Sequence, residues 1–118
     1  MPATEIPLRV LPPRERGVCC ELPRALPKQR VDELSALLKA LADPTRLEIV
    51  AILRDSAVPV CICDLQATFD LSQPTLSHHM ARLREAGLVE SGREGIWCFY
   101  SLRTDLSPAI RTIVEAIG

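Results

Sequence analysis

The sequence contains no run of about 18 apolar residues, the length that a membrane-spanning helix requires. The N-terminus also lacks the continuous apolar core of a secretory signal peptide. We therefore expect a cytoplasmic protein without a membrane partner. Nor is there an excess of positive charge, since the formal net charge of the 118 residues is −1. A strongly basic chain would indicate nucleic-acid binding by charge alone, so any DNA contact here must depend on a local group of cations.

Cysteine patterns typical of thiol enzymes are also missing. None of the five cysteines belongs to a Cys-x-x-Cys redox pair or to a phosphate-binding loop with a downstream arginine. We therefore expect no enzymatic activity and no catalytic residues. Without an export signal the thiols are expected to remain reduced, which favours metal binding or redox chemistry over a disulfide framework. These thiols are Cys19, Cys20, Cys61, Cys63 and Cys98.

What the sequence does contain is the composition of an ordinary folded protein, with 47% apolar and 25% charged residues. A chain of 118 residues forms one domain with a core of its own. A domain this small leaves apolar surface that a second subunit would cover. We therefore expect a homodimer.

Residues 1–30 are predicted to form an extended arm, because six of the ten prolines fall there and no helical or alternating apolar pattern survives. Residues 31–118 form the folded domain. Its first helix ends before Asp43, and Asp43 is expected to cap a second helix that begins at Pro44 and runs to about Arg54. The first helix is indicated by apolar residues at helical spacing, namely Val31, Leu34, Leu38 and Leu41.

A loop over residues 56–60 is expected to lead into a short helix that begins at about Cys61 or Cys63 and ends at Thr68. A tight turn through residues 69–71 follows. Ser72 is then a suitable N-cap for a longer helix that ends near Ala86 and Gly87. One side of this helix is apolar, with Leu76, Met80 and Leu83.

After Gly87 the apolar pattern changes to a period of two residues, which predicts a β-hairpin with its turn over residues 92–95. The segment from Asp105 to the C-terminus has isoleucine and valine at helical spacing and predicts a final helix. We place the first and last helices at the dimer interface. The fold class is therefore mainly α with a β-hairpin (α+β), a homodimeric winged helix-turn-helix.

In this fold the longer helix lies in the major groove of DNA. Short polar side chains near a helix N-terminus suit base edges, and backbone amides there suit phosphate. The alternative is a solvated polar helix face, which periodicity alone does not separate from a DNA-binding face. The side chains presented to DNA are Gln73, Thr75, Ser77, His78 and Arg82.

Two stretches, ALADPTRLEIVAIL and LSQPTLSHHMARLREAGLVESGREGIWCFYSL, closely resemble the ArsR/SmtB family of bacterial metal-responsive repressors over about residues 31–103. The resemblance implies a dimeric winged-helix repressor that binds double-stranded operator DNA and releases it when a metal or metalloid binds. By position, Arg93 matches the tip of the wing, where a cation can meet phosphate or the minor groove. The DNA-contacting helix is matched by Ser72, Gln73, Thr75, Ser77 and His78.

Two of the candidate residues have other interpretations. His78 could be a lone metal ligand, although no second histidine or carboxylate is placed to join it. The neighbouring His79 lies beside the apolar side of the helix, so we expect a packed histidine with one hydrogen bond. Cys98 alternates with hairpin residues such as Tyr100 and is expected to be a small packed residue.

The stretch VCICDL matches the cysteine motif that opens the short helix in the family. In a regular helix, side chains two residues apart point about 200° away from each other, so Cys61 and Cys63 could not hold one ion. If the helix begins only at Cys63 or Asp64, the two thiols lie on one side and can converge. The helix N-terminus is also expected to lower a thiol pKa. Cys19 and Cys20 in the arm would supply further thiolates.

A site made only of thiolates selects soft ions. The zinc-sensing relatives require histidine and aspartate on the last helix, and that helix has no histidine here. Trivalent arsenic and antimony prefer three thiolates in a pyramid, which Cys19, Cys20 and one of Cys61 or Cys63 would form. Cadmium, lead or bismuth would use all four. The adjacent pair in the arm departs from the spaced arm cysteines of cadmium and lead sensors, so we favour arsenite as the inducer, with no cofactor needed for DNA binding.

The resemblance suggests that the arm of one subunit reaches the short helix of the other. A metalloid would then release DNA through a coupling free energy of about 1–3 kcal/mol. The alternative on the same fold is a redox switch, in which an arm cysteine forms a disulfide with Cys61 or Cys63 under oxidation.

Overall fold

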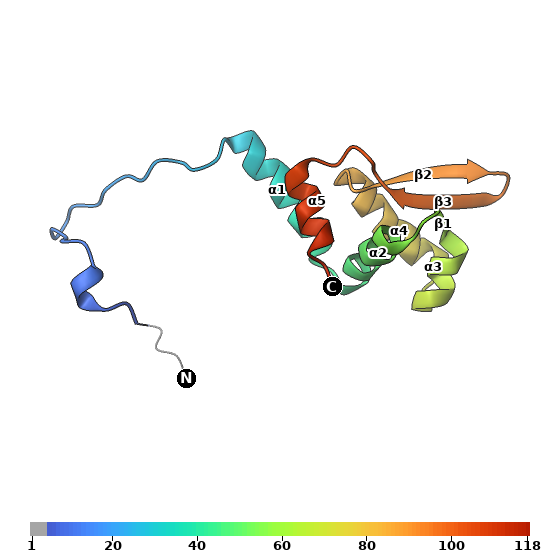
Figure 1. Ribbon diagram of the computed structural model, residues 1–118, viewed down its shortest axis with the longest axis horizontal. Helices are drawn as coiled ribbons and strands as arrows, with labels where there is room; N and C mark the ends of the chain where they lie inside the picture. Colours follow the sequence, from blue (N-terminus) through green and yellow to red (C-terminus); the bar gives the residue numbers. More distant parts are fainter. Residues whose placement is uncertain (1–4) are drawn as a thin grey trace.

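The computed structural model describes residues 5–118, so the first four residues of the expected arm lie outside the described part. Figure 1 shows an arm that runs away from a body made of helices and a small sheet. The arm contains one short 3-10 turn, η1 (Leu8–Val10), and every residue from 5 to 27 is exposed. Its prolines prevent continuous backbone hydrogen bonding, so the arm has no helix or strand that could pack.

The first two helices are α1 (Lys28–Leu41) and α2 (Pro44–Asp55). Helix α1 begins three residues before the expected boundary at residue 31, directly after Pro27. The expected cap of α2 is confirmed, because the Asp43 carboxylate accepts a hydrogen bond from the Arg46 backbone N–H at 2.9 Å and Pro44 occupies the first turn.

The helix-turn-helix pair consists of α3 (Ile62–Phe69) and α4 (Gln73–Glu85). The turn between them depends on Asp70, whose φ of 52° places it in the left-handed region that aspartate tolerates. The predicted cap of α4 is confirmed, since Ser72 accepts from the Thr75 N–H, and Gly87 follows the helix end with a φ of 77°. The predicted apolar side is also confirmed, because Leu76, Met80 and Leu83 are each 0% exposed.

The sheet has three antiparallel strands in the order β1-β3-β2, formed by β1 (Val60–Cys61), β2 (Val89–Glu94) and β3 (Trp97–Leu102). The expected loop over 56–60 was wrong at its last residue, because Val60 pairs with Tyr100 across β1 and β3. The expected turn over 92–95 was also too early. Residues 92–94 continue β2, and the chain reverses at Gly95 and Ile96, where Gly95 supplies a φ of 62°.

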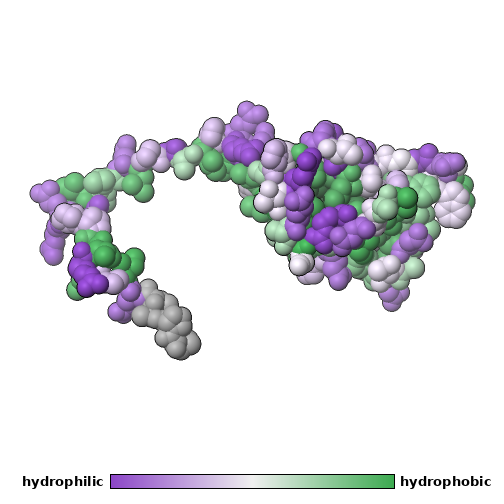
Figure 2. Space-filling model, viewed as in Figure 1, coloured by the Kyte–Doolittle hydropathy of each residue, from purple (hydrophilic) through white to green (hydrophobic). Residues whose placement is uncertain are grey.

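The final helix, α5 (Pro108–Glu115), is capped by the Ser107 hydroxyl and buries Val114 in the core. All five α-helices of the described residues and the sheet contribute to a single hydrophobic core. Its members include Leu37, Ile49, Leu65 and Leu88. Figure 1 shows α1 and α5 at the end of the body from which the arm departs. Figure 2 shows apolar residues in green along the arm and on the adjoining part of the body.

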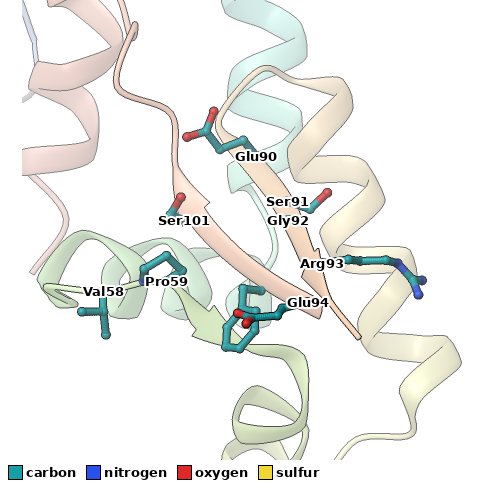
Figure 3. A pocket seen from close by; sticks show the side chains of 9 residues that line it. Val58, Pro59, Glu90, Ser91, Gly92, Arg93, Glu94 and Ser101 are labelled. Atoms are coloured by element: carbon teal, nitrogen blue, oxygen red, sulfur yellow. The ribbon is translucent and has the colours of Figure 1, made fainter. Parts of the chain in front are cut away.

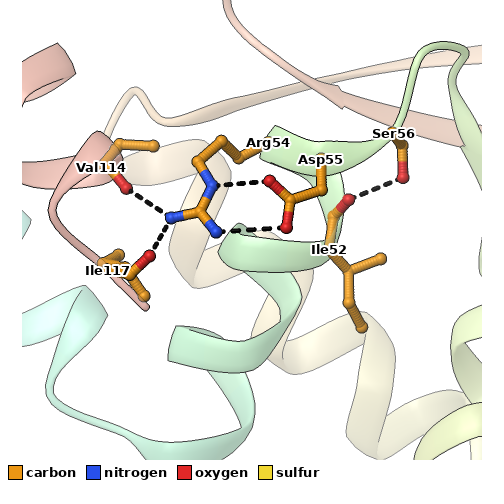
Figure 4. A network of polar contacts seen from close by, with 6 residues as sticks. All are labelled: Ile52, Arg54, Asp55, Ser56, Val114 and Ile117. Atoms are coloured by element: carbon orange, nitrogen blue, oxygen red, sulfur yellow. Dashed lines mark hydrogen bonds and ion pairs between the residues drawn. The ribbon is translucent and has the colours of Figure 1, made fainter.

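A side-chain network fastens α5 to α2. The Arg54 guanidinium donates to the Val114 carbonyl at 3.1 Å and to the Ile117 carbonyl, while Asp55 accepts from it at 2.9 and 3.2 Å (Figure 4). Arginine at a helix C-terminus satisfies carbonyls that have no partner within the helix. Arg54 therefore fixes the end of α5 against α2. Among the described helices, none is long and apolar enough to span a membrane.

Candidate nucleic-acid interface and thiol site

Helix α4 presents a polar side to solvent because its opposite side is buried against the core. The structure places each predicted DNA-contacting residue of this helix on the surface or at its edge: Ser72, Gln73, Thr75, His78 and Arg82 are exposed, and Ser77 is half-buried. An exposed polar helix held by a buried apolar stripe has the geometry that enters the major groove.

Two of these residues already have intramolecular partners. The Ser72 hydroxyl donates to the Thr75 Oγ1 at 2.9 Å and accepts from the Thr75 N–H at 3.3 Å, so these side chains also shape the first turn. Arg82 forms an ion pair with Glu85 at 3.5 Å, and both side chains are more than half exposed. Such surface pairs are weak, so Arg82 remains free to contact phosphate.

Arg93 lies on β2, on the same side of the sheet as α4 (Figure 3). Burial raises the pKa of Tyr100, and the positive charges of Arg84 and Arg93 act in the opposite direction. Arg84 of α4 and Arg93 of the wing therefore both lie near this ring. Sequence analysis did not identify Arg84, because its proximity to the wing depends on how α4 packs against β2.

Two more cations were missed for the same reason. Lys39 of α1 and Arg46 of α2 line a hollow that also contains His78 and Arg82 of α4. The Arg46 Nε donates to the Ala40 carbonyl at 2.7 Å, and its Nη1 lies 3.1 Å from the His79 Nδ1. His79 is half-buried and makes this contact, which confirms the expectation of a packed histidine. Cations from three helices thus converge beside α4, although the net charge of the whole chain is −1.

Cys61 and Cys63 lie together at the start of α3, with their sulfur atoms 2.8 Å apart. The expected convergence is confirmed, although the helix begins at Ile62 and not at Cys63 or Asp64. Cys61 is the N-cap residue with an extended backbone (φ −70°, ψ 139°), and an N-cap side chain turns back over the first turn of its helix. Cys61 is buried and Cys63 is exposed, so a ligand reaches the pair from the side of Cys63.

The expected lowering of a thiol pKa is wrong for Cys63. Its hydrogen bond with Cys61 raises the pKa to about 11, and burial and the negative charges of Cys61 and Asp64 act in the same direction. The local sulfur and carboxylate groups thus outweigh the helix N-terminus, whose contribution is small at an exposed position. In the free protein the Cys63 sulfur retains its proton.

The arm cysteines lie in a locally ordered stretch. The Val18 N–H donates to the Glu15 carbonyl at 3.1 Å in a turn that requires a φ of 81° at Gly17. The Arg14 guanidinium donates to the Val18 carbonyl at 3.2 Å and lies 3.9 Å from the Cys20 sulfur. Cys19 and Cys20 are both exposed after this turn.

The structure does not bring the arm pair to the α3 pair within one chain. Over residues 5–118 there is no group of three or more histidine, cysteine or acidic residues placed to hold a metal ion. Figure 1 shows the arm directed away from the body. Cys98 is half-buried on β3 and packs against the core, which agrees with a structural role. A three-thiolate site therefore requires the arm to meet α3 in another arrangement of chains.

Comparison with known proteins gives a consistent result. The sequence pattern of bacterial regulatory proteins of the arsR family matches residues 43–91. The arsenical resistance operon repressor of Staphylococcus xylosus is 42% identical over 86 residues, which cover 73% of this chain and 81% of that protein. The protein of the same name from Escherichia coli is 47% identical over 79 residues, 67% of each chain. The structure of HlyU from Vibrio cholerae matches with a TM-score of 0.65 at 33% identity, covering 75% of this chain and 90% of that one.

Proposed function

The chain belongs to the arsR family of bacterial regulatory proteins, which are DNA-binding transcriptional regulators and not enzymes, and on this premise we propose a specific function. The protein binds operator DNA as a homodimer and represses transcription. Trivalent arsenic, or antimony, binds to cysteine thiolates and releases the repressor from DNA. The observation that carries this proposal is the Cys61–Cys63 sulfur pair at the start of the helix-turn-helix.

The DNA-binding part of the proposal is supported by the surface around α4. Its polar side chains are exposed, Arg93 projects toward α4 (Figure 3), and Lys39 and Arg46 add positive charge from other helices. Phosphate contacts position a protein on DNA, and base contacts provide sequence specificity. We assign Gln73, Thr75, Ser77 and His78 to base edges and the arginines to phosphate.

The homodimer part is supported by apolar surface that one chain leaves uncovered. On α1, Val31 is 46% and Leu38 is 52% exposed, and both line an apolar hollow that also includes Leu34. Helix α5, at the same end of the body as α1 in Figure 1, keeps Ile110 and Ile113 half-buried. Covering these side chains in a two-fold interface would stabilise the dimer by a free energy of about 25 cal/mol for each Å² of apolar area removed from water.

The inducer part is supported by the kinds of ligand available. Sulfur donors alone favour a soft ion, and the relatives named arsenical resistance operon repressor favour arsenic among these. Arsenous acid would exchange three hydroxides for Cys19, Cys20 and one of the α3 thiols. Each thiol proton leaves with a hydroxide as water, so three waters form and no electron is transferred. When Cys63 is the third ligand, its proton is lost in the same exchange.

The position of the site supports its coupling to DNA. Helix α3 packs directly against α4 and against the sheet that carries Arg93. A ligand that binds more tightly in the DNA-free arrangement shifts the equilibrium only by that difference in affinity, typically about 1–3 kcal/mol.

The test uses the reduced full-length protein under anaerobic conditions, with operator DNA followed by fluorescence anisotropy. Sodium arsenite is expected to release the DNA with the appearance of arsenic–thiolate absorption. The variant with Cys19→Ser and Cys20→Ser should retain repression and lose the response, and Cys98→Ser serves as the matched control.

X-ray absorption on the arsenic-loaded protein is then expected to count three sulfur neighbours for arsenic. Release that requires an oxidant would instead support the redox switch, and a four-sulfur site specific for cadmium, lead or bismuth would replace the arsenite assignment.

A further inference from the structure

The outer face of the sheet contains a groove, and of the predicted DNA-contacting residues only Arg93 lines it. Side chains of β3 alternate, so Phe99 and Ser101 face this groove while Tyr100 packs into the core. Val58 and Pro59 form one wall, and Figure 3 shows Glu90 and Glu94 on the opposite wall.

A glycine keeps this groove open. Gly92 lies directly across from Phe99 in the register of β2 and β3. A Cβ atom at Gly92 would have no neighbour within 4 Å, so the space beside Gly92 is open. The backbone at Gly92 does not need a left-handed φ. The absence of a side chain here therefore shapes the surface and does not serve the fold.

The groove lies on the same sheet face as a candidate arsenic ligand. Cys61 pairs with Phe99 across β1 and β3, and directly opposite residues of antiparallel strands project their side chains to the same face. One row across the sheet thus contains Cys61, Phe99 and Gly92. A segment that lies in the groove over Phe99 ends beside the Cys61–Cys63 pair.

The arm carries side chains that complement this groove. Val18 is 50% and Leu22 is 84% exposed, and both flank the Cys19–Cys20 pair. Arg14 and Arg16 precede the pair, with Glu15 between them and Glu21 after the pair, whereas the groove carries the carboxylates of Glu90 and Glu94 and one cation, Arg93, whose side chain projects toward α4. Apolar residues beside the thiols would cover Phe99, and the arginines would meet the carboxylates.

Resting on the proposed function, we propose that this groove is the docking site for the arm of a second copy of the chain. Residues 14–22 of that arm lie across Phe99, with the arginines beside Glu90 and Glu94 and the two thiols beside Cys61 and Cys63. The groove thereby aligns the arm before the arsenic–sulfur bonds form.

The length of the groove agrees with the reach of the arm. Glu94 is two strands across and two residues along from Cys61, which corresponds to about 12 Å. The chain from Arg14 to Cys20 spans at most about 20 Å when extended, and its turn shortens it. We assign the second copy because the arm leaves α1 at the end of the body away from the hairpin (Figure 1).

The test exploits the single tryptophan of the chain. Trp97 is 51% exposed and lies opposite Glu94, so its fluorescence reports on the groove. Full-length protein is titrated with sodium arsenite while arsenic–thiolate absorption and acrylamide quenching of Trp97 are recorded. In the wild-type chain, arsenite is expected to lower the quenching constant at least about twofold as the arm covers the groove.

Gly92→Val fills the groove with a residue that suits a strand. It is expected to weaken arsenite binding about tenfold, because the arm loses its alignment and the effective concentration of its thiols falls. Ser91→Val is the matched control, because Ser91 points to the other side of β2 in Figure 3 and should leave arsenite affinity unchanged. As an independent measurement, Glu90→Lys with Glu94→Lys should weaken binding, and adding Arg14→Glu with Arg16→Glu should restore it.

The outcomes separate this inference from the proposed function. Arsenic–thiolate absorption with wild-type affinity in Gly92→Val, together with unchanged Trp97 quenching, overturns the docking site and leaves the sensor intact. No such absorption in the wild-type chain overturns the sensor and the docking site together. Finally, chains carrying Cys19→Ser and Cys20→Ser are mixed with chains carrying Cys61→Ser and Cys63→Ser. Recovery of absorption supports docking between copies, and no recovery overturns it.

Discussion

At the scale of single residues, one position explains the geometry of the thiol pair. Cys61 is the N-cap of α3 with an extended backbone, so its sulfur folds over the first turn and meets Cys63. Sequence spacing predicted convergence only if the helix began later, at Cys63 or Asp64. The backbone conformation of the cap residue achieves the same result with the helix beginning at Ile62.

The raised pKa of Cys63 should be measurable as reactivity. In a chain with Cys19, Cys20 and Cys98 replaced by serine, Cys63 should alkylate slowly at pH 8, because its pKa is raised to about 11. Adding Cys61→Ser removes the hydrogen bond and the negative charge, so the pKa falls and more thiolate forms. The rate with iodoacetamide is expected to rise about tenfold, since lower intrinsic nucleophilicity offsets part of the gain. An unchanged rate would show that Cys61 does not control Cys63.

The cap of α2 gives a second prediction at this scale. The backbone N–H of Arg46 lowers the pKa of Asp43, so the native state prefers the carboxylate. This contribution is complete above the ordinary carboxyl pKa and is lost as pH falls through the lower native value. Asp43→Ala is expected to lower the free energy of unfolding by about 1 kcal/mol at pH 7, as measured by urea denaturation.

The effect of Asp43→Ala should shrink steadily as pH falls below about 4, the ordinary carboxyl pKa, and through the lowered native pKa at which the wild-type carboxylate takes up its proton. Asp32→Ala, an exposed change on α1, is the control and should have little effect at either pH. An Asp43→Ala deficit of equal size at pH 3 and pH 7 would contradict the role assigned to the carboxylate.

At the scale of elements, α4 and the wing act as one surface because Arg93 projects to the side of α4. Arg82→Ala should weaken operator binding in all sequence contexts and reduce the slope of log K against log salt by about one, because one phosphate contact is lost. Arsenite affinity of the free protein should not change. Arg103→Ala is the control, since Arg103 is held by Asp105 at 2.7 Å beyond the end of β3. A wild-type salt slope in Arg82→Ala would remove this residue from the interface.

Most elements could be predicted because their ends carry explicit local signals. Asp43 and Ser72 are cap residues, and Gly87 stops a helix, so the order of helices followed from the sequence. Strand β1 could not be predicted in this way, since two residues have no period. The hairpin turn was misplaced because Gly92 and Gly95 are both turn residues by composition, and only the pairing register separates them.

The candidate site divides in the same manner. The exposure of Gln73 and His78 followed from helical periodicity, which needs only local geometry. Lys39 and Arg46 could not be found, because they reach the interface through contacts between helices. Arg84 could not be found, because its approach to the wing depends on how α4 packs against β2. The meeting of the arm with α3 cannot follow from one chain at all, since over residues 5–118 the two thiol pairs form no common cluster.

At the scale of the whole molecule, the exposed apolar residues of α1 and the arm indicate that a single chain is incomplete. Leu38 is 52% exposed although it lies in the middle of a helix that buries Leu37. Leu38→Glu should leave the folded monomer intact and raise the dimer dissociation constant about 10- to 100-fold, because one leucine no longer leaves water on association. Sedimentation equilibrium measures this change.

Gln29→Glu adds the same charge at an exposed position near the start of α1 and serves as the control for Leu38→Glu. Operator affinity should fall together with dimerisation, since two half-sites need two helices α4. A dimer that forms as tightly as wild type with Leu38→Glu would place the interface elsewhere.

Cys61 belongs to two elements at once, as the last residue of β1 and the cap of α3. Strand β1 is bonded to the wing through β3, and α3 is packed on α4. In the proposed mechanism, a displacement of this one sulfur is therefore transmitted directly to both parts that we assign to DNA, and no signal has to cross the interior from a distant effector site. We therefore expect release of the repressor to be a single step, in which helix α4 and the wing dissociate from the operator together.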